Sequence, residues 1–105
     1  MRCQEGEMAI GRKAASHPWK SQTILMRVRQ ASGVYAIFNT KDWIYVGESG
    51  DIRKSLLAHF DGDNACIKRN APFGFQFELT PASERVARKK KLIAELGPIC
   101  NRRAG

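Results

Sequence analysis

Residues 33–38 read GVYAIF, residues 39–42 read NTKD and residues 43–47 read WIYVG. The two outer stretches are rich in β-branched and aromatic residues, which favour β-strands. The four polar residues between them have the composition of a turn. We therefore predict an antiparallel hairpin over residues 33–47, with a four-residue link between its strands.

A helix is expected directly after this hairpin. Residues 49–50 break the second strand, and Asp51 is a residue type that caps helix N-termini. Apolar residues then recur at i, i+4 and i+8, as Ile52, Leu56 and Phe60. This spacing predicts a helix that runs to Phe60 and buries one face.

The next stretch consists of a polar segment followed by a predicted strand. Residues 61–72 are polar, with room for at most a turn of helix around residues 65–69. Residues 73–80 alternate aromatic and polar side chains, which predicts a half-buried strand. Its stripe of Phe73, Phe75 and Phe77 is expected in the core; a base-stacking platform is the alternative.

A final helix is predicted after this strand. Thr80 fits the N-cap and Pro81 the first helical position, and the helix should stop at residues 97–98, which read Gly-Pro. Along it, one stripe at helical spacing is expected to face the body of the domain. The stripe consists of Val86, Lys89, Ile93 and Leu96.

These elements predict an α+β fold of the order β-β-α-β-α, with a small three-stranded antiparallel sheet flanked by helices. Residues 1–22 are interpreted as a partly ordered N-terminal arm, and residues 23–105 as one domain. Within residues 23–29 a period of two suggests an added strand, with a helical turn as the alternative.

Charge is the strongest signal in the composition. The chain has 18 Lys and Arg against 10 Asp and Glu, a formal net charge of +8. Such an excess favours nucleic acid first and an anionic membrane second as partner; a basic solvated surface is the alternative. No apolar run approaches the roughly 20 residues of a membrane span, and no secretory h-region is present, so a cytoplasmic protein that is not bound to a membrane is expected.

Three cysteines, Cys3, Cys66 and Cys100, stand far apart without a C-x-x-C pair. Neither a zinc ribbon nor a redox motif is indicated. We expect free thiols in a reducing cytosol. A metal site shared by His59 and Cys66 is the alternative.

The segments Gly33-Val34-Tyr35 and Tyr45-Val46-Gly47 together resemble the two halves of the motif of the GIY-YIG nuclease superfamily. The likeness continues through the helix that carries His59 and ends in a closing segment with a Pro and an Asn, residues 98 and 101. It covers about residues 31–103. It implies the fold of that superfamily, whose members hydrolyse DNA phosphodiesters with one divalent metal.

The resemblance also implies a site. Tyr35 and Tyr45 would line it and help activate water, beside His59 and Asn101. The family has a phosphate-binding arginine eight residues after the motif glycine, where this chain has Ser55. It has a metal-binding glutamate twelve residues before the asparagine, where this chain has Lys89. An ammonium group cannot ligate Mg²⁺, although it can hold a phosphate.

We therefore expect a catalytically inactive domain that binds nucleic acid, DNA rather than RNA, with no metal and no cofactor; Mg²⁺ or Mn²⁺ enters only if the domain is active. One alternative is an active nuclease that uses Glu48 or an unusual metal arrangement, and another is a non-enzymatic module with a protein partner. The candidate nucleic-acid-binding residues are Arg53, Lys54, Arg85, Arg88, Lys89, Lys90, Lys91, Arg102 and Arg103.

Overall fold

A four-stranded antiparallel sheet forms the centre of the protein. The structure is a computed structural model, and it describes residues 10–11 and 15–101. The strands lie in the order β1-β4-β2-β3. Their bounds are β1 His17–Pro18, β2 Gly33–Phe38, β3 Trp43–Ser49 and β4 Gly74–Leu79.

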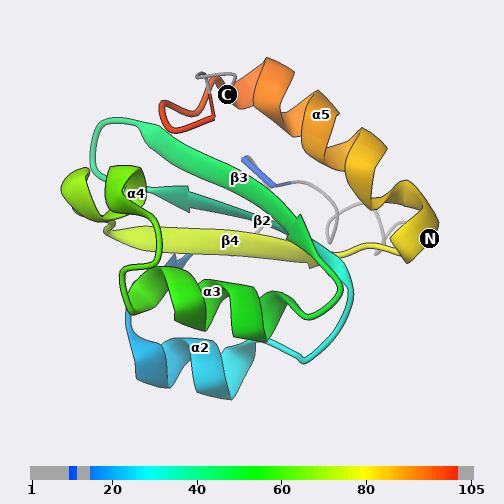
Figure 1. The fold of residues 1–105 in the computed structure, drawn as a ribbon, viewed down its shortest axis with the longest axis horizontal. Coiled ribbons are helices and arrows are strands. Elements are labelled where there is room, and N and C mark those ends of the chain that lie inside the picture. The colour runs from blue at the N-terminus through cyan, green and yellow to red at the C-terminus, as the bar shows by residue number, and fades with distance from the viewer. Residues whose placement is uncertain (1–9, 12–14, 102–105) are drawn as a thin grey trace.

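Helices cover both faces of this sheet (Figure 1). α5 lies on one face, and α2 and α3 lie on the other. The helices are α2 Ser21–Arg27, α3 Ile52–Phe60, α4 Ala65–Arg69 and α5 Arg85–Leu96, with a 3-10 turn, η1 Ala82–Glu84, before α5. None of the helices in the described part of the chain has the length and apolarity that crossing a membrane requires.

The predicted hairpin is confirmed as β2 and β3. The side chain of Asn39 organises its link, because Oδ1 accepts the backbone N–H groups of Lys41 and Asp42 at 2.8 and 2.7 Å. Such an Asn-centred turn closes the link with local hydrogen bonds. The register shifts between Ile37 and Phe38, which leaves Ile44 without a strand partner and lets it join the core.

The first predicted helix is also confirmed, and its start follows from one side chain. The Asp51 carboxylate accepts the backbone N–H of Lys54 at 3.0 Å, which satisfies a donor at the helix end. Ile52 and Leu56 are fully buried, whereas Phe60 at the end of α3 is 37% exposed.

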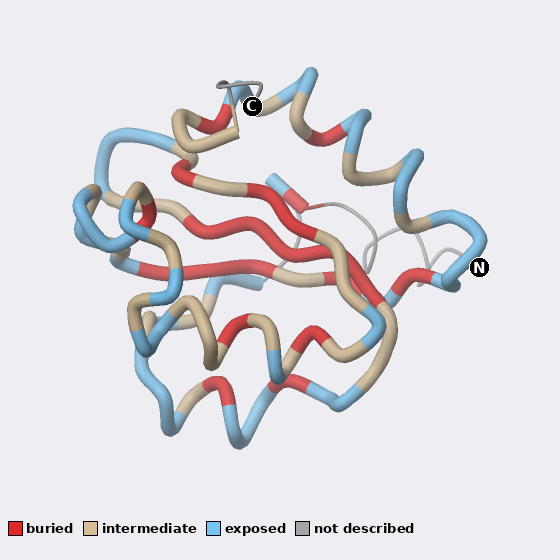
Figure 2. Tube along the Cα trace, viewed as in Figure 1, coloured by how far each residue is buried: buried red, intermediate tan, exposed pale blue. Residues whose placement is uncertain are grey.

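The core has two halves, one on each face of β2 (Figure 2). β2 is buried along nearly its whole length because it lies between two strands and two helical layers. Its odd-numbered residues, Tyr35 and Ile37, face α3, and its even-numbered residues, Val34 and Ala36, face Leu92 of α5. Side chains that reach the α3 face therefore form a separate environment from those beneath α5.

The prediction of a three-stranded sheet is wrong by one strand. The segment that contains β1 pairs antiparallel with β4, with His17 opposite Phe75, and Trp19 N–H donates to the Phe73 carbonyl at 3.1 Å. The residue before Pro18 is biased towards extended backbone, which suits an edge strand. Two paired residues are too short to produce a hydrophobic period, so the strand left no pattern in the sequence.

The expected strand within residues 23–29 is a helix, α2. Ile24 is fully buried against α3, whereas Leu25 and Met26 are 51% and 71% exposed. The alternation of Ile24, Met26 and Val28 is therefore coincidental, because Met26 contributes nothing to the core. Ile24 and the C-cap residue Val28 belong to the same core cluster as Ile52 and Leu56 of α3.

The phenylalanine stripe is core only in part. Phe75 is fully buried and Phe77 is partly buried, but Phe73 precedes β4 and is 63% exposed. The last helix ends as predicted, because Gly97 adopts a left-handed conformation with φ of 59°.

Two details of the start and face of α5 differ from expectation. Thr80 is not an N-cap; its hydroxyl donates to the Glu78 carbonyl at 3.5 Å, and η1 precedes the helix. Val86 is 55% exposed, and Leu92 is the fully buried residue of the helix. Arg85 and Arg88, rather than Val86, meet the sheet near the first turn. The helix therefore turns a different face towards the sheet than the predicted stripe.

The expectation of free thiols is wrong for two of the three cysteines. Cys66 and Cys100 form a disulfide whose Cα atoms lie 5.8 Å apart. The residues are 34 positions apart in the chain and meet because α4 packs beside the closing segment. This pairing also removes Cys66 from the metal site considered with His59. Cys3 lies outside the described residues.

Candidate functional site

The two motif strands place a tyrosine over a glycine. Tyr35 of β2 is paired directly with Gly47 of β3, on the face of the sheet that α3 covers. A Cβ atom built on Gly47 would collide with the ring and hydroxyl of Tyr35. The second motif needs glycine at this position because the Tyr35 ring lies across the neighbouring strand.

A hydrogen-bonded chain begins at that tyrosine. The Tyr35 hydroxyl lies 2.8 Å from Nε2 of His59, and Nδ1 of His59 lies 2.8 Å from Oδ1 of Asp63. The His59 side chain is 9% exposed and that of Asp63 is 50% exposed. His59 is therefore held at both ring nitrogens, between a buried phenol and a carboxylate near the surface.

Tyr45 completes an aromatic cluster with Tyr35 and His59. Its ring centroid lies 6.3 Å from that of Tyr35 and 5.3 Å from that of His59. The Tyr35 and His59 centroids are 5.6 Å apart. The structure thus brings together three of the residues that the resemblance indicated, at distances typical of aromatic packing.

Burial keeps both phenols neutral. It raises the pKa of Tyr35 well above the usual range, helped by the neighbouring Tyr45 and Asp63, while a hydrogen bond with Ser55 acts in the opposite direction. Burial likewise raises the pKa of Tyr45, with smaller effects of Asp63 and Glu48. A cation at position 55 would lower these pKa values, and Ser55 has no charge to do so.

Ser55 instead connects α3 to the end of β3. Its hydroxyl donates to Oγ of Ser49 at 2.8 Å, and Ser49 is in turn bonded to the backbone of Asp51. Arg53 turns away, because its Nε donates to the Val28 carbonyl at 2.8 Å. Lys54 is exposed on the surface of α3.

Asn101 lies at the free edge of β3. Its Oδ1 accepts the Val46 backbone N–H at 2.7 Å, and its Nδ2 donates to the Val46 carbonyl at 3.0 Å. The side chain thus imitates a neighbouring strand at the residue between Tyr45 and Gly47. The closing segment continues this pairing, since Cys100 N–H donates to the Ile44 carbonyl at 2.8 Å.

Two carboxylates beneath α5 form a row across the sheet. Glu48 of β3 and Glu78 of β4 are both paired with Val34 of β2. Arg85 Nε donates to Glu48 at 2.7 Å, and Arg88 donates to both oxygens of Glu78 at 2.6 and 3.0 Å. These contacts tie α5 to the sheet and raise the pKa of Arg88, chiefly through its hydrogen bonds with Glu78.

The ion pairs change the interpretation of three predicted residues. Arg85 and Arg88, which were predicted to bind nucleic acid, instead form ion pairs with Glu48 and Glu78 of the sheet. Glu48, the best acidic candidate for catalysis, is bound to Arg85. Of the other candidate cations on α5, Lys89 is partly buried and residues 90–91 are exposed. Residues 102–103 lie outside the described part of the chain.

The described residues do not fit a divalent metal. Mg²⁺ takes oxygen ligands, usually including carboxylates. Within residues 10–11 and 15–101, no group of three or more His, Cys, Asp or Glu side chains could hold a metal ion. Glu48 and Asp63 each have a partner, and a lysine stands at position 89.

The fold and this cluster define a nuclease-like α+β domain. Comparison with protein families matches residues 31–96, which are 66 of the 105 residues, to the GIY-YIG catalytic domain. The chain belongs to the GIY-YIG family.

Solved structures with the same fold include the GIY-YIG N-terminal endonuclease domain of UvrC from Thermotoga maritima. A tyrosine-to-phenylalanine variant bound to its catalytic divalent cation is 21% identical, with a TM-score of 0.66, over 78% of this chain and 93% of that chain. The magnesium-bound domain is 17% identical, with a TM-score of 0.62, over 74% and 91%. A search of curated proteins found no match.

Some functional contacts were missed from the sequence. Asp63 lies four residues after His59, beyond the end of the predicted helix, and i, i+4 spacing is the signal that would have indicated this pair. The pairing of Glu48 with Arg85, 37 residues apart, left no such local signal.

Proposed function

We propose that this GIY-YIG domain binds DNA without hydrolysing it by a divalent metal. The observation that carries the proposal is the state of Glu48 and Asp63, the two carboxylates whose charges act on the tyrosines. Glu48 is neutralised by Arg85, Asp63 is bonded to His59, and position 89 holds a lysine. Hydrolysis in the family needs a carboxylate for its metal, and each of these groups is already used or replaced.

The tyrosines support the same conclusion. A phenol assists the attack of water best when it can give up its proton. Here burial raises the pKa of Tyr35 and of Tyr45, and no guanidinium at position 55 counters it. Neither phenol is therefore adjusted to give up its proton near neutral pH, and the Tyr35 hydroxyl is already hydrogen-bonded with His59.

The aromatic part of the family site is retained. The three tyrosines replaced in the UvrC variants are ten and fourteen residues apart. Tyr35, Tyr45 and His59 have the same two spacings. We infer that His59 occupies the position of the third tyrosine. In this proposal the aromatic residues of the site are kept, whereas its charged groups are not.

DNA would be held by lysines. Lys89 is a point charge where the family has a carboxylate, and it converts a position for a metal into one for a phosphate oxygen. Lys54, Lys90 and Lys91 are exposed and add contacts to the phosphate backbone. Arg85 and Arg88 are left out of this surface because they bind Glu48 and Glu78.

A plasmid assay tests the loss of hydrolysis. Supercoiled plasmid is incubated with the protein and Mg²⁺ or Mn²⁺, beside the double variant Ser55→Arg/Lys89→Glu. We expect no nicking by the parent, and nicking by the variant that Tyr45→Phe suppresses. Metal-dependent nicking by the parent, abolished by Tyr45→Phe, would overturn the proposal.

A further inference from the structure

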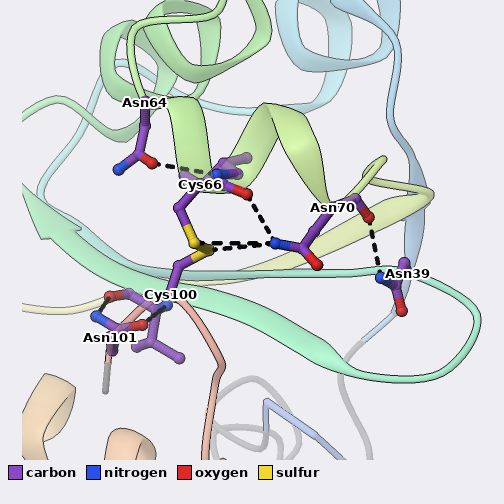
Figure 3. The surroundings of a disulfide bond; sticks show 8 residues. Asn39, Asn64, Cys66, Asn70, Cys100 and Asn101 are labelled. Atoms are coloured by element: carbon purple, nitrogen blue, oxygen red, sulfur yellow. Dashed lines mark hydrogen bonds between the residues drawn. A yellow bond between two sulfur atoms is a disulfide. The ribbon is translucent and has the colours of Figure 1, made fainter. Parts of the chain in front are cut away.

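The disulfide joins α4 to the closing segment after α5 (Figure 3). Cys66 lies in the first turn of α4, and Cys100 lies in the closing segment after α5. Both cysteines are only partly buried, so a thiol in solution can approach them. The bond is the sole covalent link between these two segments apart from the backbone.

Each segment holds one part of the site. The residue next to Cys100 is Asn101, whose amide grips both backbone groups of Val46. The loop that leads into α4 carries Asp63, the partner of His59. The Cys66–Cys100 bond therefore limits movement between the segment of Asn101, which is bonded to β3, and the segment of Asp63, which is bonded to His59.

An amide donor stands beside the sulfur atoms. Nδ2 of Asn70 donates to the Cys66 carbonyl at 2.9 Å and lies 3.8 Å from both Sγ atoms. The Asn70 carbonyl accepts from Asn39 of the hairpin link at 3.0 Å, which helps to hold this residue in place. A donor in this position stabilises a thiolate, the leaving group when a disulfide is reduced.

We propose that Cys66–Cys100 is a reversible redox clamp on the closing segment, and that opening it weakens DNA binding. The second half rests on the proposed function. We expect the protein in the cytoplasm, where disulfides that form are commonly transient and regulatory rather than structural.

The reductant is a dithiol, either a small molecule or a protein. One of its thiolates attacks Sγ of Cys66 or Cys100, the sulfur–sulfur bond breaks, and the other cysteine leaves as a thiolate stabilised by Asn70. The second thiol of the reductant then displaces the first cysteine from the mixed disulfide. Two electrons and two protons pass to the protein, which gains two thiols, and the reductant becomes a disulfide.

Reduction does not itself break the hydrogen bonds of the closing segment. It removes the disulfide that limits the opening of this segment. Without this tether the closing segment should open locally more often. Val46 reports this directly, because its N–H is protected by Asn101. Ala36, its pairing partner in the central strand, is the matched control amide.

The test uses the full chain with Cys3→Ser, compared air-oxidised and after dithiol reduction. Alkylation and mass measurement should find no free thiol in the first form and two in the second. Hydrogen exchange of the Val46 amide should be at least about tenfold faster in the reduced form, with Ala36 unchanged. Re-oxidation should restore the slow rate. Two free thiols in air-oxidised protein, or equal Val46 rates in both forms, would overturn the clamp.

DNA binding is measured on the same two samples. We expect reduction, and the double variant Cys66→Ser/Cys100→Ser, to raise the dissociation constant for DNA several-fold. Faster exchange at Val46 with unchanged affinity would overturn the link to DNA. If neither redox form binds DNA, the proposed function fails, and the exchange of Val46 still decides whether the clamp exists.

Discussion

The hydroxyl of Tyr35 lies 2.8 Å from Nε2 of His59, and the opposite ring nitrogen of that histidine meets Asp63 at the same distance. The tyrosine comes from the central strand and the histidine from the last turn of α3, 24 residues later. This contact holds α3 on the sheet at the aromatic cluster.

The first prediction concerns the ionisation of the tyrosines. Tyr35 and Tyr45 are the two tyrosines of the chain, so phenolate absorbance reports on the site alone. Because burial raises both pKa values, little phenolate should form at about pH 10, where a free tyrosine is half ionised. The folded state then binds more protons than the unfolded state, so stability should fall as pH rises above about 10.

An ultraviolet pH titration of the native protein, with Tyr45→Phe to isolate Tyr35, checks this. An ordinary tyrosine titration curve in that variant would show that Tyr35 is not buried as described.

The second prediction concerns the orientation of His59. Asp63→Asn replaces the carboxylate at Nδ1, so the distribution of the ring proton between the two nitrogens should change. The cost in stability should be below about 1 kcal/mol, because Asp63 is half exposed. Nitrogen chemical shifts of the His59 ring measure the first effect and thermal unfolding the second. Asp61→Asn, at an exposed neighbouring position, should leave both unchanged.

The third prediction concerns the ion pair under α5. Arg88→Ala leaves the Glu78 carboxylate, whose side chain is fully buried, without its guanidinium group. Removing one partner of a buried pair costs about 3–5 kcal/mol, so a large loss in the free energy of unfolding is expected. Urea denaturation measures it. Lys90→Ala, on the exposed face of the same helix, should stay within about 0.5 kcal/mol of the parent; equal losses in both variants would contradict the assignment.

The fourth prediction concerns DNA contacts. Lys90→Glu/Lys91→Glu removes two exposed cations from α5, so DNA affinity should fall and the salt slope should decrease by roughly two. Fluorescence anisotropy over a series of salt concentrations measures both. Lys20→Glu/Lys41→Glu, at exposed positions outside α5, controls for the same change in net charge. A salt-independent affinity in the parent would instead favour a protein partner.

The fifth prediction concerns the motif glycine. Gly47→Ala places a methyl group against the Tyr35 ring, so the ring or the strand must move. Such overpacking costs about 1–3 kcal/mol. Gly50→Ala is the matched control, because its nearest neighbour would be the tip of Arg85 at 3.7 Å. Chemical unfolding should separate the two variants; a neutral Gly47→Ala would mean that the tyrosine does not lie across β3.

Several elements could be predicted because their signals are local. Runs of β-branched and aromatic residues around a polar link predicted the hairpin of β2 and β3, and a capping carboxylate at Asp51 predicted the start of α3. Counting from Gly47 and Asn101 led to the hypothesis that Ser55 and Lys89 stand where the family has its arginine and glutamate, and this stays a prediction. These inferences depend on neighbours in the chain, where backbone propensity and spacing act directly.

The amino-acid sequence by itself thus determined the family and the hairpin. Tertiary structure alone decided that Arg85 neutralises Glu48, that β1 adds a fourth strand and that Cys66 reaches Cys100. Each of these contacts joins residues more than 30 positions apart, and local periodicity carries no record of such distant partners. They form only when packing of the two faces of β2 has brought the segments together.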